Sequence, residues 1–395
     1  MSIRPVLDLA QLRRDTPGVG NRIHFNNAGA ALPPQPVVDT VVDHLRREAE
    51  IGGYEAVEEA HERIDGIYAS LARLLNAAPE ELALVENATA GWSLAFHAVP
   101  FKPGDRILTA RAEYASNYIS YLQAARKSGV SVEVVPSLVS GELDVAALER
   151  MIDDRVRLIS ITHVPTNGGL INPAAEIGRI ARRHGILYLL DACQSAGQLP
   201  LDVAELGCDM LTATGRKYLR GPRGTGFLYI RRALAERLEP AMLDLHGANW
   251  VAPDRYECRP DARRFENWEK AWAGFLGLGV AVDYALDLGL PAISDRVGGL
   301  AEHLRGELAE VPGVTVRDIG RQRCGIVTFT AEGREASEIK TALAAHSINV
   351  VTSGPASTLL DATARGLPEV VRASVHCYND EDEVARFIAA LKRVL

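Results

Sequence analysis

Short apolar runs alternate with longer segments of helical periodicity between about residue 36 and residue 286. Most of these runs lack the polar alternation of a half-exposed strand, so they predict strands that are buried on both faces. The segments between them, such as 118–128 and 174–184, have apolar residues at helical spacing. Strands that alternate with helices form a mostly parallel sheet covered by helices. The predicted strands are residues 82–85, 106–108, 130–135, 158–162, 186–190, 210–213 and 226–230.

The pattern changes after about residue 289. Here helices and strands follow one another in an order typical of a smaller α+β domain, and the last helix begins at Asn379 or Asp380, both favourable N-caps. We therefore predict a large α/β domain over residues 21–286 and a small α+β domain built from residues 1–20 and 287–395. The predicted elements of the small domain are helices 292–311 and 336–346, strands 324–330, 349–352 and 370–374, and a final helix.

Length, charge and cysteine content narrow the classes of function. A chain of 395 residues exceeds what one core holds and suits two domains with a cleft between them. A net charge of -8 with scattered basic residues argues against a nucleic-acid partner. We find no apolar stretch typical of a signal peptide or a membrane span, so we expect a cytoplasmic protein. The five cysteines include no CxxC pair, so we expect reduced thiols and no metal site.

Lys217 lies just beyond a predicted strand in a glycine-rich segment, LTATGRKYLRGPRGTGFLYI. A lysine that reacts with an aldehyde cofactor must be deprotonated part of the time, and burial or a positive neighbour such as Arg216 lowers its pKa. A solvated loop lysine fits this segment equally well. Asp191 follows the strand 186–190 and is expected at the same edge of the sheet, where its carboxylate is a suitable partner for a pyridinium nitrogen. A helix N-cap is the alternative for Asp191; the pair together favours a pyridoxal phosphate site.

Three further segments add candidate contacts. In VENATAG a strand turns through small residues into a helix predicted over residues 92–98. N–H groups at such a helix start bind phosphate, although an ordinary N-cap fits too. Tyr114, in RAEYASNY, is suited to stack on a flat ring or to pack in the core. Arg372 lies in an apolar strand and needs an anion, either a substrate carboxylate or an acidic residue of the chain. Thr214 and Arg216 flank Gly215 and offer a hydroxyl and a guanidinium for phosphate.

These motifs, in their order along the chain, resemble the class V aminotransferases. The family contains cysteine desulfurases, selenocysteine lyases, kynureninases and isopenicillin N epimerase-like proteins, and the resemblance begins near Phe25 and reaches the C-terminus. It implies the fold type I of enzymes that depend on pyridoxal 5'-phosphate (PLP): a mostly parallel seven-stranded sheet flanked by helices, plus a smaller α+β domain. The motifs are FNNAGA, ENATAGW, EYASNY, THVPTNGGLINP, DACQSAG, TGRKYLRGPRGTGFLY, RRFENWE and VVRASVHCYNDEDEV.

The resemblance also implies roles for single residues. Lys217 would hold PLP as a Schiff base, Asp191 would pair with the ring nitrogen, and Gln194 would bind the phenolic oxygen, with Asn167 near the same edge. Tyr114 would stack on the ring. The phosphate would be bound by Ala88, Thr89, Thr214 and Arg216, and the substrate carboxylate by Arg372 and Asn27.

Three departures from the desulfurase pattern bear on the reaction. Tyr114 and Arg216 stand where histidines are usual, and neither change removes the cofactor. Near Glu269 the threonine that reaches the partner subunit's phosphate is missing. The segment VVTSGPASTLLDATARGLP has no cysteine, whereas desulfurases carry a persulfide-forming cysteine in this loop.

We therefore expect a C–S lyase that carries out β-elimination on a small, cysteine-derived amino acid and uses no persulfide cysteine. The alternatives are an isopenicillin N epimerase-like epimerase and a class V aminotransferase. A non-catalytic scaffold is disfavoured because a binding role does not need Lys217, Asp191 and Arg372 together. The resemblance also implies a homodimer. Candidate interface residues are Trp250, Trp268 and Trp272, and candidate contributors to substrate specificity are His246, Asn249, Tyr256 and Arg264.

Overall fold

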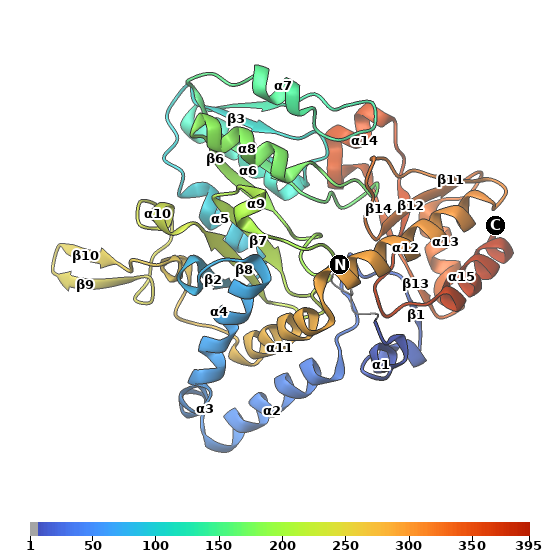
Figure 1. Cartoon of the computed structure of the whole chain (residues 1–395), viewed down its shortest axis with the longest axis horizontal. Helices are drawn as coiled ribbons and strands as arrows, with labels where there is room; N and C mark the ends of the chain where they lie inside the picture. Colours follow the sequence, from blue (N-terminus) through green and yellow to red (C-terminus); the bar gives the residue numbers. More distant parts are fainter. Residues whose placement is uncertain (1–6) are drawn as a thin grey trace, which may run out of the picture.

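The computed structural model describes residues 7–395 and is built around one seven-stranded sheet (Figure 1). The strand order is β2-β8-β7-β6-β5-β3-β4. Strands β7, β6, β5, β3 and β4 run parallel to one another, whereas β8 runs antiparallel to both β2 and β7. This confirms the predicted α/β fold with a mostly parallel sheet. The strands are β2 (Leu82–Val85), β3 (Arg106–Thr109), β4 (Ser131–Val134), β5 (Val156–Thr162), β6 (Leu187–Asp191), β7 (Met210–Thr214) and β8 (Gly226–Ile230).

Both faces of this sheet are buried, which explains the continuous apolar runs. Successive residues of a strand point to opposite faces, and Leu189 and Leu190 of β6 accordingly belong to two different core clusters. β4, at the edge, differs from the other strands in that none of its residues is fully buried. The helices around the sheet are α2 (Gln35–Ile51), α3 (Gly53–Glu59), α4 (His61–Leu75), α5 (Ala88–His97), α6 (Ala115–Ser128), α7 (Val145–Arg150), α8 (Ala174–His184), α9 (Val203–Leu206), α10 (Arg232–Ala235) and α11 (Trp272–Leu288).

The C-terminal part forms a separate four-stranded antiparallel sheet of order β11-β12-β15-β14. Its own core contains Phe329 and Phe387, and the ring of Phe25 from the N-terminal segment lies 5.4 Å from that of Phe387. β1 (Ile23–His24) also pairs with β13 (Ile348–Asn349). The division at residues 21 and 286 stays a prediction. The remaining elements are β11 (Val314–Val316), β12 (Ile326–Ala331), β14 (Val351–Ser353), β15 (Val370–Ser374), α12 (Leu290–Ala309), α13 (Ala336–Ala345), α14 (Leu359–Arg365), α15 (Glu381–Val394), α1 (Leu9–Arg14), and short 3-10 turns Pro17–Gly20, Pro79–Glu81, Ala262–Phe265 and Pro355–Thr358.

Three local features differ from the predicted elements or refine them. α5 begins at Ala88, one turn earlier than expected, because Asn87 caps it by accepting a hydrogen bond from the N–H of Ala90 (2.9 Å). Asp380, rather than Asn379, caps the last helix. A hairpin of β9 (Ala248–Ala252) and β10 (Arg255–Cys258) was not predicted; it protrudes from the body in Figure 1 and has no buried face that would produce an apolar pattern.

Across residues 7–395 no single helix has both the length and the hydropathy of a membrane span. α11 and α12 have this length and hydropathy only when the two helices are taken together, and the second helix is bent by 81° relative to the first.

Candidate active site

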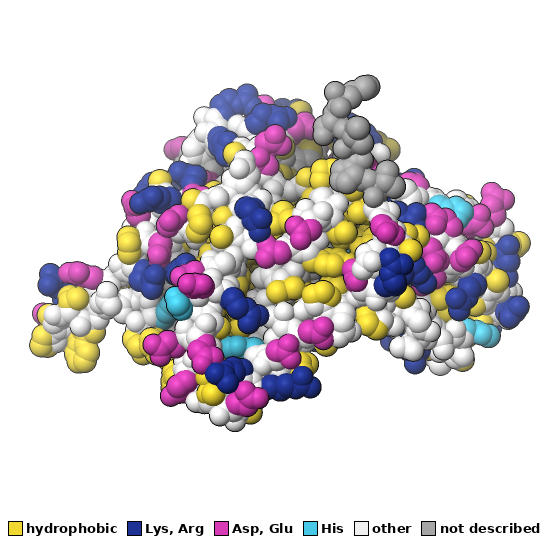
Figure 2. Space-filling model, turned by 60° about the horizontal axis from the view of Figure 1, so that its bottom comes forward, with side chains coloured by type: hydrophobic (Ala, Val, Ile, Leu, Met, Phe, Trp, Pro, Cys, Tyr) yellow, Lys and Arg dark blue, Asp and Glu magenta, His cyan; other side chains and the backbone are white. Residues whose placement is uncertain are grey.

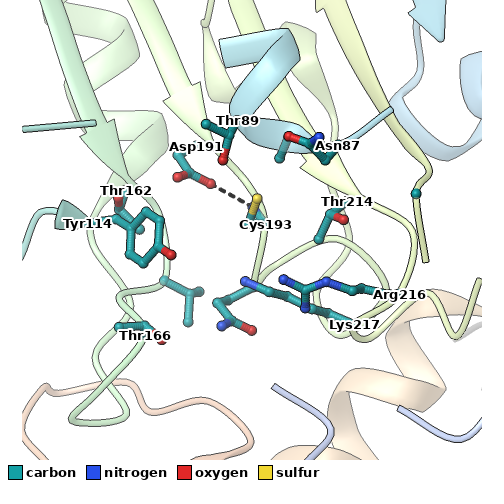
Figure 3. Close-up of a pocket in the computed structure, with 14 residues that line it drawn as sticks. Asn87, Thr89, Tyr114, Thr162, Thr166, Asp191, Cys193, Thr214, Arg216 and Lys217 are labelled. Carbon is teal, nitrogen blue, oxygen red and sulfur yellow. Dashed lines mark hydrogen bonds between the residues drawn. The ribbon is translucent and has the colours of Figure 1, made fainter. Parts of the chain in front are cut away.

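A pocket opens at the edge of the sheet where β5, β6 and β7 end, and it brings most of the predicted site residues together. Lys217 and Asp191 line the same pocket. Figure 3 shows Lys217 and Arg216 reaching into it from the loop after β7, with Tyr114 and Asp191 on other sides. The lining residues are Asn87, Ala88, Thr89, Tyr114, Thr162, Val164, Thr166, Asp191, Cys193, Gln194, Thr214, Arg216, Lys217 and Gly224.

Asp191, the last residue of β6, is held by two donors. Its Oδ1 accepts a hydrogen bond from the N–H of Cys193 (2.9 Å), and its Oδ2 accepts one from Nδ2 of Asn117 (2.9 Å). The side chain is buried, and no lysine or arginine of residues 7–395 forms an ion pair with it. Each oxygen keeps a second lone pair for a donor in the pocket. The carboxylate is thus oriented but not neutralised by the protein.

Lys217 is partly buried, and its Nζ has no hydrogen-bond partner within residues 7–395. Burial lowers the pKa of Lys217, and the positive charges of Arg216 and Arg372 add to this effect against the opposing influence of Asp191. A lysine in contact with bulk water keeps its ordinary pKa, so the geometry argues against a solvated loop lysine. The amine is available for a reaction with an aldehyde.

The start of α5 forms one end of the pocket. Ala88 and Thr89 lie in the first turn, where N–H groups have no acceptor within the helix. Gly226 of β8 passes close beside them: a Cβ there would lie 3.2 Å from the N of Ala88 and 2.7 Å from the carbonyl oxygen of Ala213. Thr214 completes this end, with its hydroxyl donating to the carbonyl of Thr225 (3.2 Å). The arrangement suits a phosphate group.

Gln194 and Tyr114 line other parts of the wall. Nε2 of Gln194 donates to the carbonyl of Ala28 (3.1 Å), whereas its Oε1 is buried without a hydrogen-bond partner. Which amide atom faces the pocket is an assignment, and either one leaves a polar group that a ligand can satisfy. The ring of Tyr114 is 38% exposed, so it is not a core residue. Both side chains are placed to contact a bound ring.

Arg372 lies next to the pocket but does not line it. Its Nη1 donates to the hydroxyl and the carbonyl of Thr166, at 2.7 and 3.2 Å, and Thr166 is a lining residue. Nε is buried without a partner, and no carboxylate of residues 7–395 forms an ion pair with the guanidinium. Burial lowers the pKa of Arg372 to about 10. An internal salt bridge therefore does not explain this arginine, and its free donors suit the carboxylate of a ligand.

Two predicted substrate or cofactor contacts lie outside the pocket lining. Asn27 is fully buried, and its Nδ2 donates to the carbonyls of Ser374 (2.7 Å) and His24 (3.1 Å), while its Oδ1 accepts from the hydroxyl of Tyr378. The structure does not support a contact of Asn27 with substrate, because its amide joins the N-terminal segment to the small sheet. Asn167 follows Thr166, and its Oδ1 is buried without a partner.

The four candidates for substrate specificity also lie elsewhere. Asn249 and Tyr256 are exposed on the protruding hairpin. Arg264 is buried and donates to the carbonyls of Arg259 and Leu238, which is a structural role. His246 lines a second cavity, not the one that contains Lys217.

Sequence reasoning missed several residues of the pocket and its surroundings. Cys193 lies between two predicted residues, and its position between Asp191 and Gln194 was a usable signal. Asn117 follows Tyr114 by three residues at the start of α6, which places it on the same side of that helix. Thr162 and Thr166 gave no signal, since threonines near strand ends are common. The other missed lining residues are Asn87, Val164 and Gly224.

The residues present fit PLP. Lys217, whose pKa is lowered by burial, suits an aldehyde, and the Asp191 carboxylate, which has no ion-pair partner within residues 7–395, suits a pyridine nitrogen. The helix start with free N–H groups suits a phosphate, and the unsatisfied polar atoms of Gln194 and Arg372 suit a phenolic oxygen and a substrate carboxylate. Four of these features line a single pocket, and Arg372 lies next to it. The roles of the individual residues follow from this fit as proposals.

Comparisons with known proteins agree with this geometry. The family model described as "Aminotransferase class-V" matches residues 23–387. A probable cysteine desulfurase of Xylella fastidiosa (strain 9a5c) is 33% identical, over 98% of this chain and 95% of that protein. The apo structure of a cysteine desulfurase from Thermococcus onnurineus NA1 is 27% identical with a TM-score of 0.91, and the alignment covers 100% of this chain and 99% of that one.

A third similarity concerns the fold alone. The cystine C–S lyase C-DES, solved with its reaction product cysteine persulfide, is 24% identical with a TM-score of 0.86, over 95% of this chain and 99% of that one. The match of the family model spans nearly the whole chain and includes every residue of the pocket. This chain therefore belongs to the class V aminotransferase family, whose cofactor is pyridoxal 5'-phosphate.

Proposed function

We propose that this protein is a PLP-dependent C–S lyase that acts on a cysteine-derived amino acid by β-elimination. With water, the substrate yields a thiol, pyruvate and ammonia. The observation that carries the proposal is that Lys217 and Asp191 line one pocket, beside Arg372, which forms no ion pair with a carboxylate of residues 7–395. The relative at 33% identity is described as a probable cysteine desulfurase, and this description supports a cysteine-derived substrate.

When bound, PLP supplies an aldehyde that joins the substrate amine and a ring that withdraws electrons from the α-carbon. The chain's own residues control protons and orientation. Nζ of Lys217, whose pKa burial lowers, accepts the proton from the α-carbon. Asp191 would lie against the ring nitrogen, and the N–H groups of Ala88 and Thr89 would hold the phosphate. These residues would orient the cofactor relative to Lys217.

Arg372 supports an amino-acid substrate. Because Nη1 is occupied by Thr166, Nε and Nη2 are left to bind the two oxygens of one carboxylate. Such bidentate binding orients the substrate as well as holding it. The carboxylate also offsets the free energy that burial of the guanidinium costs.

The lyase outcome is favoured over desulfuration by the positions of the thiols. The segment that forms β14, the turn Pro355–Thr358 and α14 contains no cysteine. Cys193 lines the pocket, but burial and the charge of Asp191 raise the pKa of its thiol, so it is a poor nucleophile. β-Elimination needs no thiol acceptor, because the sulfur leaves with its own substituent and the carbon skeleton ends as pyruvate.

We also propose a homodimer. A second cavity, of about 700 Å³, lies between α2, α3 and the segment 268–273, and it is lined by Leu45, Tyr54, Trp268 and Trp272. Tyr54 is 78% exposed and Trp268 is 50% exposed, while Trp272 also packs against the core. Figure 2 shows hydrophobic side chains near the middle of this face and at the end of the protruding hairpin, which carries Trp250. An exposed apolar surface of this kind is typical of subunit contacts.

The experiment is a product analysis of the PLP-loaded protein. L-cysteine, cystine and S-substituted cysteines are supplied in turn, and pyruvate, ammonia, thiol and alanine are measured together. We expect pyruvate and ammonia in equal amounts and no alanine. The Lys217→Ala protein should form none of these products, whereas Lys340→Ala, which changes an exposed lysine of α13, should match the unaltered protein.

Each alternative gives a different result in this experiment. Alanine in place of pyruvate means that the sulfur was removed with the amino group retained, which is desulfuration. A pyridoxamine form that is converted back by 2-oxo acids means transamination, and a racemised substrate without ammonia means epimerisation. Any of these three outcomes overturns the lyase proposal.

A further inference from the structure

A second carboxyl group, Glu113, is buried near Asp191 and does not line the pocket. It lies between β3 and α6, is 3% exposed and accepts five hydrogen bonds. Oε1 accepts from the N–H of Tyr114 (2.8 Å), from Nδ2 of Asn117 (2.9 Å) and from the hydroxyl of Thr162. Oε2 accepts from the N–H of Thr162 (3.1 Å) and the hydroxyl of Thr109 (3.1 Å). The group is therefore fixed by three neighbouring segments at once.

Asn117 connects this carboxyl group to Asp191. Its Nδ2 donates both to Oε1 of Glu113 and to Oδ2 of Asp191, each over 2.9 Å. A carboxamide nitrogen carries two hydrogens, so one serves each carboxyl group. The opposite orientation would place the amide oxygen against two carboxyl groups and is unfavourable. Glu113 thus ensures that the NH₂ group, not the oxygen, faces Asp191.

We infer that Asn117 is a positioning residue that keeps Asp191 ionised and aligned, and that Glu113 contributes only by orienting Asn117, so that the proton shared with the cofactor's ring nitrogen stays on the nitrogen. The inference rests on the proposed role of Asp191 in the PLP site. A donor stabilises the ionised form of a carboxyl group. With the N–H of Cys193 on Oδ1 and the amide of Asn117 on Oδ2, the plane of the Asp191 carboxylate is fixed at two points.

The alternative position of the shared proton is on Asp191, which leaves the ring neutral and a weaker electron sink. Loss of the Asn117 donor favours that position because it destabilises the Asp191 anion. The charged and titratable groups around Glu113 are Asp191 on β6 and the phenols of Tyr121 on α6 and Tyr188 on β6. Burial raises the pKa of both phenols well above 10, so they stay uncharged, and Asp191 is the charge that Glu113 interacts with.

The test measures the ring nitrogen directly. Asn117→Ala and Glu113→Gln proteins are loaded with PLP labelled with ¹⁵N in the ring, and the ¹⁵N chemical shift is recorded at pH 8. Gln123→Ala is the matched control, because Gln123 is an exposed amide on the same helix. We expect the protonated-pyridine shift in the unaltered protein and the control, and a clear move toward the unprotonated value in Asn117→Ala. The move in Glu113→Gln should be smaller, because loss of the neighbouring charge favours the Asp191 anion while loss of the acceptor releases Asn117.

Turnover gives a second readout. In the variants kcat for pyruvate formation should fall about tenfold or more, with KM within about twofold, since loss of one hydrogen bond to a charged group corresponds to about a factor of ten. An unchanged ¹⁵N shift in cofactor-loaded variants overturns the inference. Loss of all cofactor binding from both variants at saturating PLP also overturns it, because positioning predicts bound cofactor with an altered ring. If the unaltered protein itself binds no PLP through Lys217, the proposed function fails instead.

Discussion

Replacement of Arg372 by methionine tests the substrate-binding part of the proposal with a magnitude that the structure provides. Nε and Nη2 are free to donate to a carboxylate, and a hydrogen bond between charged groups is worth about 1.5–3 kcal/mol. Loss of both bonds therefore costs about 3–6 kcal/mol, which lowers kcat/KM by about 10²- to 10⁴-fold. Arg372→Lys keeps the charge with a single donor direction and should lose about half of this free energy.

The same substitution should not destabilise the protein without substrate. Burial lowers the pKa of Arg372 from 12.5 to about 10, so keeping the guanidinium charged costs the folded state about 3 kcal/mol. Methionine removes this cost along with the two hydrogen bonds to Thr166. We expect the free energy of unfolding of Arg372→Met to be within about 1 kcal/mol of the unaltered value, or higher. Denaturant unfolding of the apo protein measures it.

The assay compares a cysteine-derived substrate with the corresponding amine that lacks the carboxylate. The unaltered protein should strongly prefer the acid, and Arg372→Met should treat the two compounds almost alike. If Arg372→Met loses as much activity on the amine as on the acid, the arginine does not bind the carboxylate and the reasoning is wrong. PLP binding, followed by absorbance, should be equal in both proteins.

Three further predictions concern the cofactor, the subunit contact and pH. The rate at which apo protein gains the yellow colour of lysine-bound PLP should rise with pH to a midpoint below 10.5, because the pKa of Lys217 is lowered, and Lys217→Ala should never gain it. Tyr54→Glu combined with Trp268→Glu should give a monomer by analytical ultracentrifugation if these exposed rings form the dimer contact. Burial raises the pKa of Glu113 from 4.5 to about 7, so the contribution of Glu113 to stability is full below pH 4.5 and is lost between pH 4.5 and 7. The difference in unfolding free energy between Glu113→Gln and the unaltered protein should therefore favour the variant more at pH 8 than at pH 5. An equal difference at both pH values would contradict this.

The fold was predictable where burial leaves a pattern in the sequence. Strands such as β5 and β6 are covered on both faces, so they appear as continuous apolar runs, and Lys217 and Asp191 follow such runs directly. The β9–β10 hairpin is mostly exposed, so its residues show no apolar face. The start of α5 was placed late because Ala88 and Thr89 are as common in loops as in a first helical turn.

The tertiary environment of single polar residues was not predictable in the same way. Asn27 was expected at the substrate, yet its amide is taken up by Ser374 and Tyr378, which are distant in sequence and adjacent only after the small sheet forms. Glu113 and Asn117 appeared to be ordinary residues at a helix start. Their importance depends on β3, β5 and β6 being neighbours, which places Thr162 and Asp191 against them.

The positions at which this chain departs from the desulfurase pattern bear on the reaction itself. The first step proposed for this chain, removal of the α-proton, uses an amine, a carboxylate at the ring nitrogen and a phosphate site, and Lys217, Asp191 and the start of α5 provide them at one edge of the sheet. The outcome is decided later, by what receives the proton and the sulfur. In this chain the departures from the desulfurase pattern lie in Tyr114 over the pocket, in Arg216 beside the lysine and in the cysteine-free loop before β15. A chain that keeps the first step but changes the groups that receive the proton and the sulfur is expected to act on the same kind of substrate and to form a different product. The ratio of pyruvate to alanine measures this difference directly.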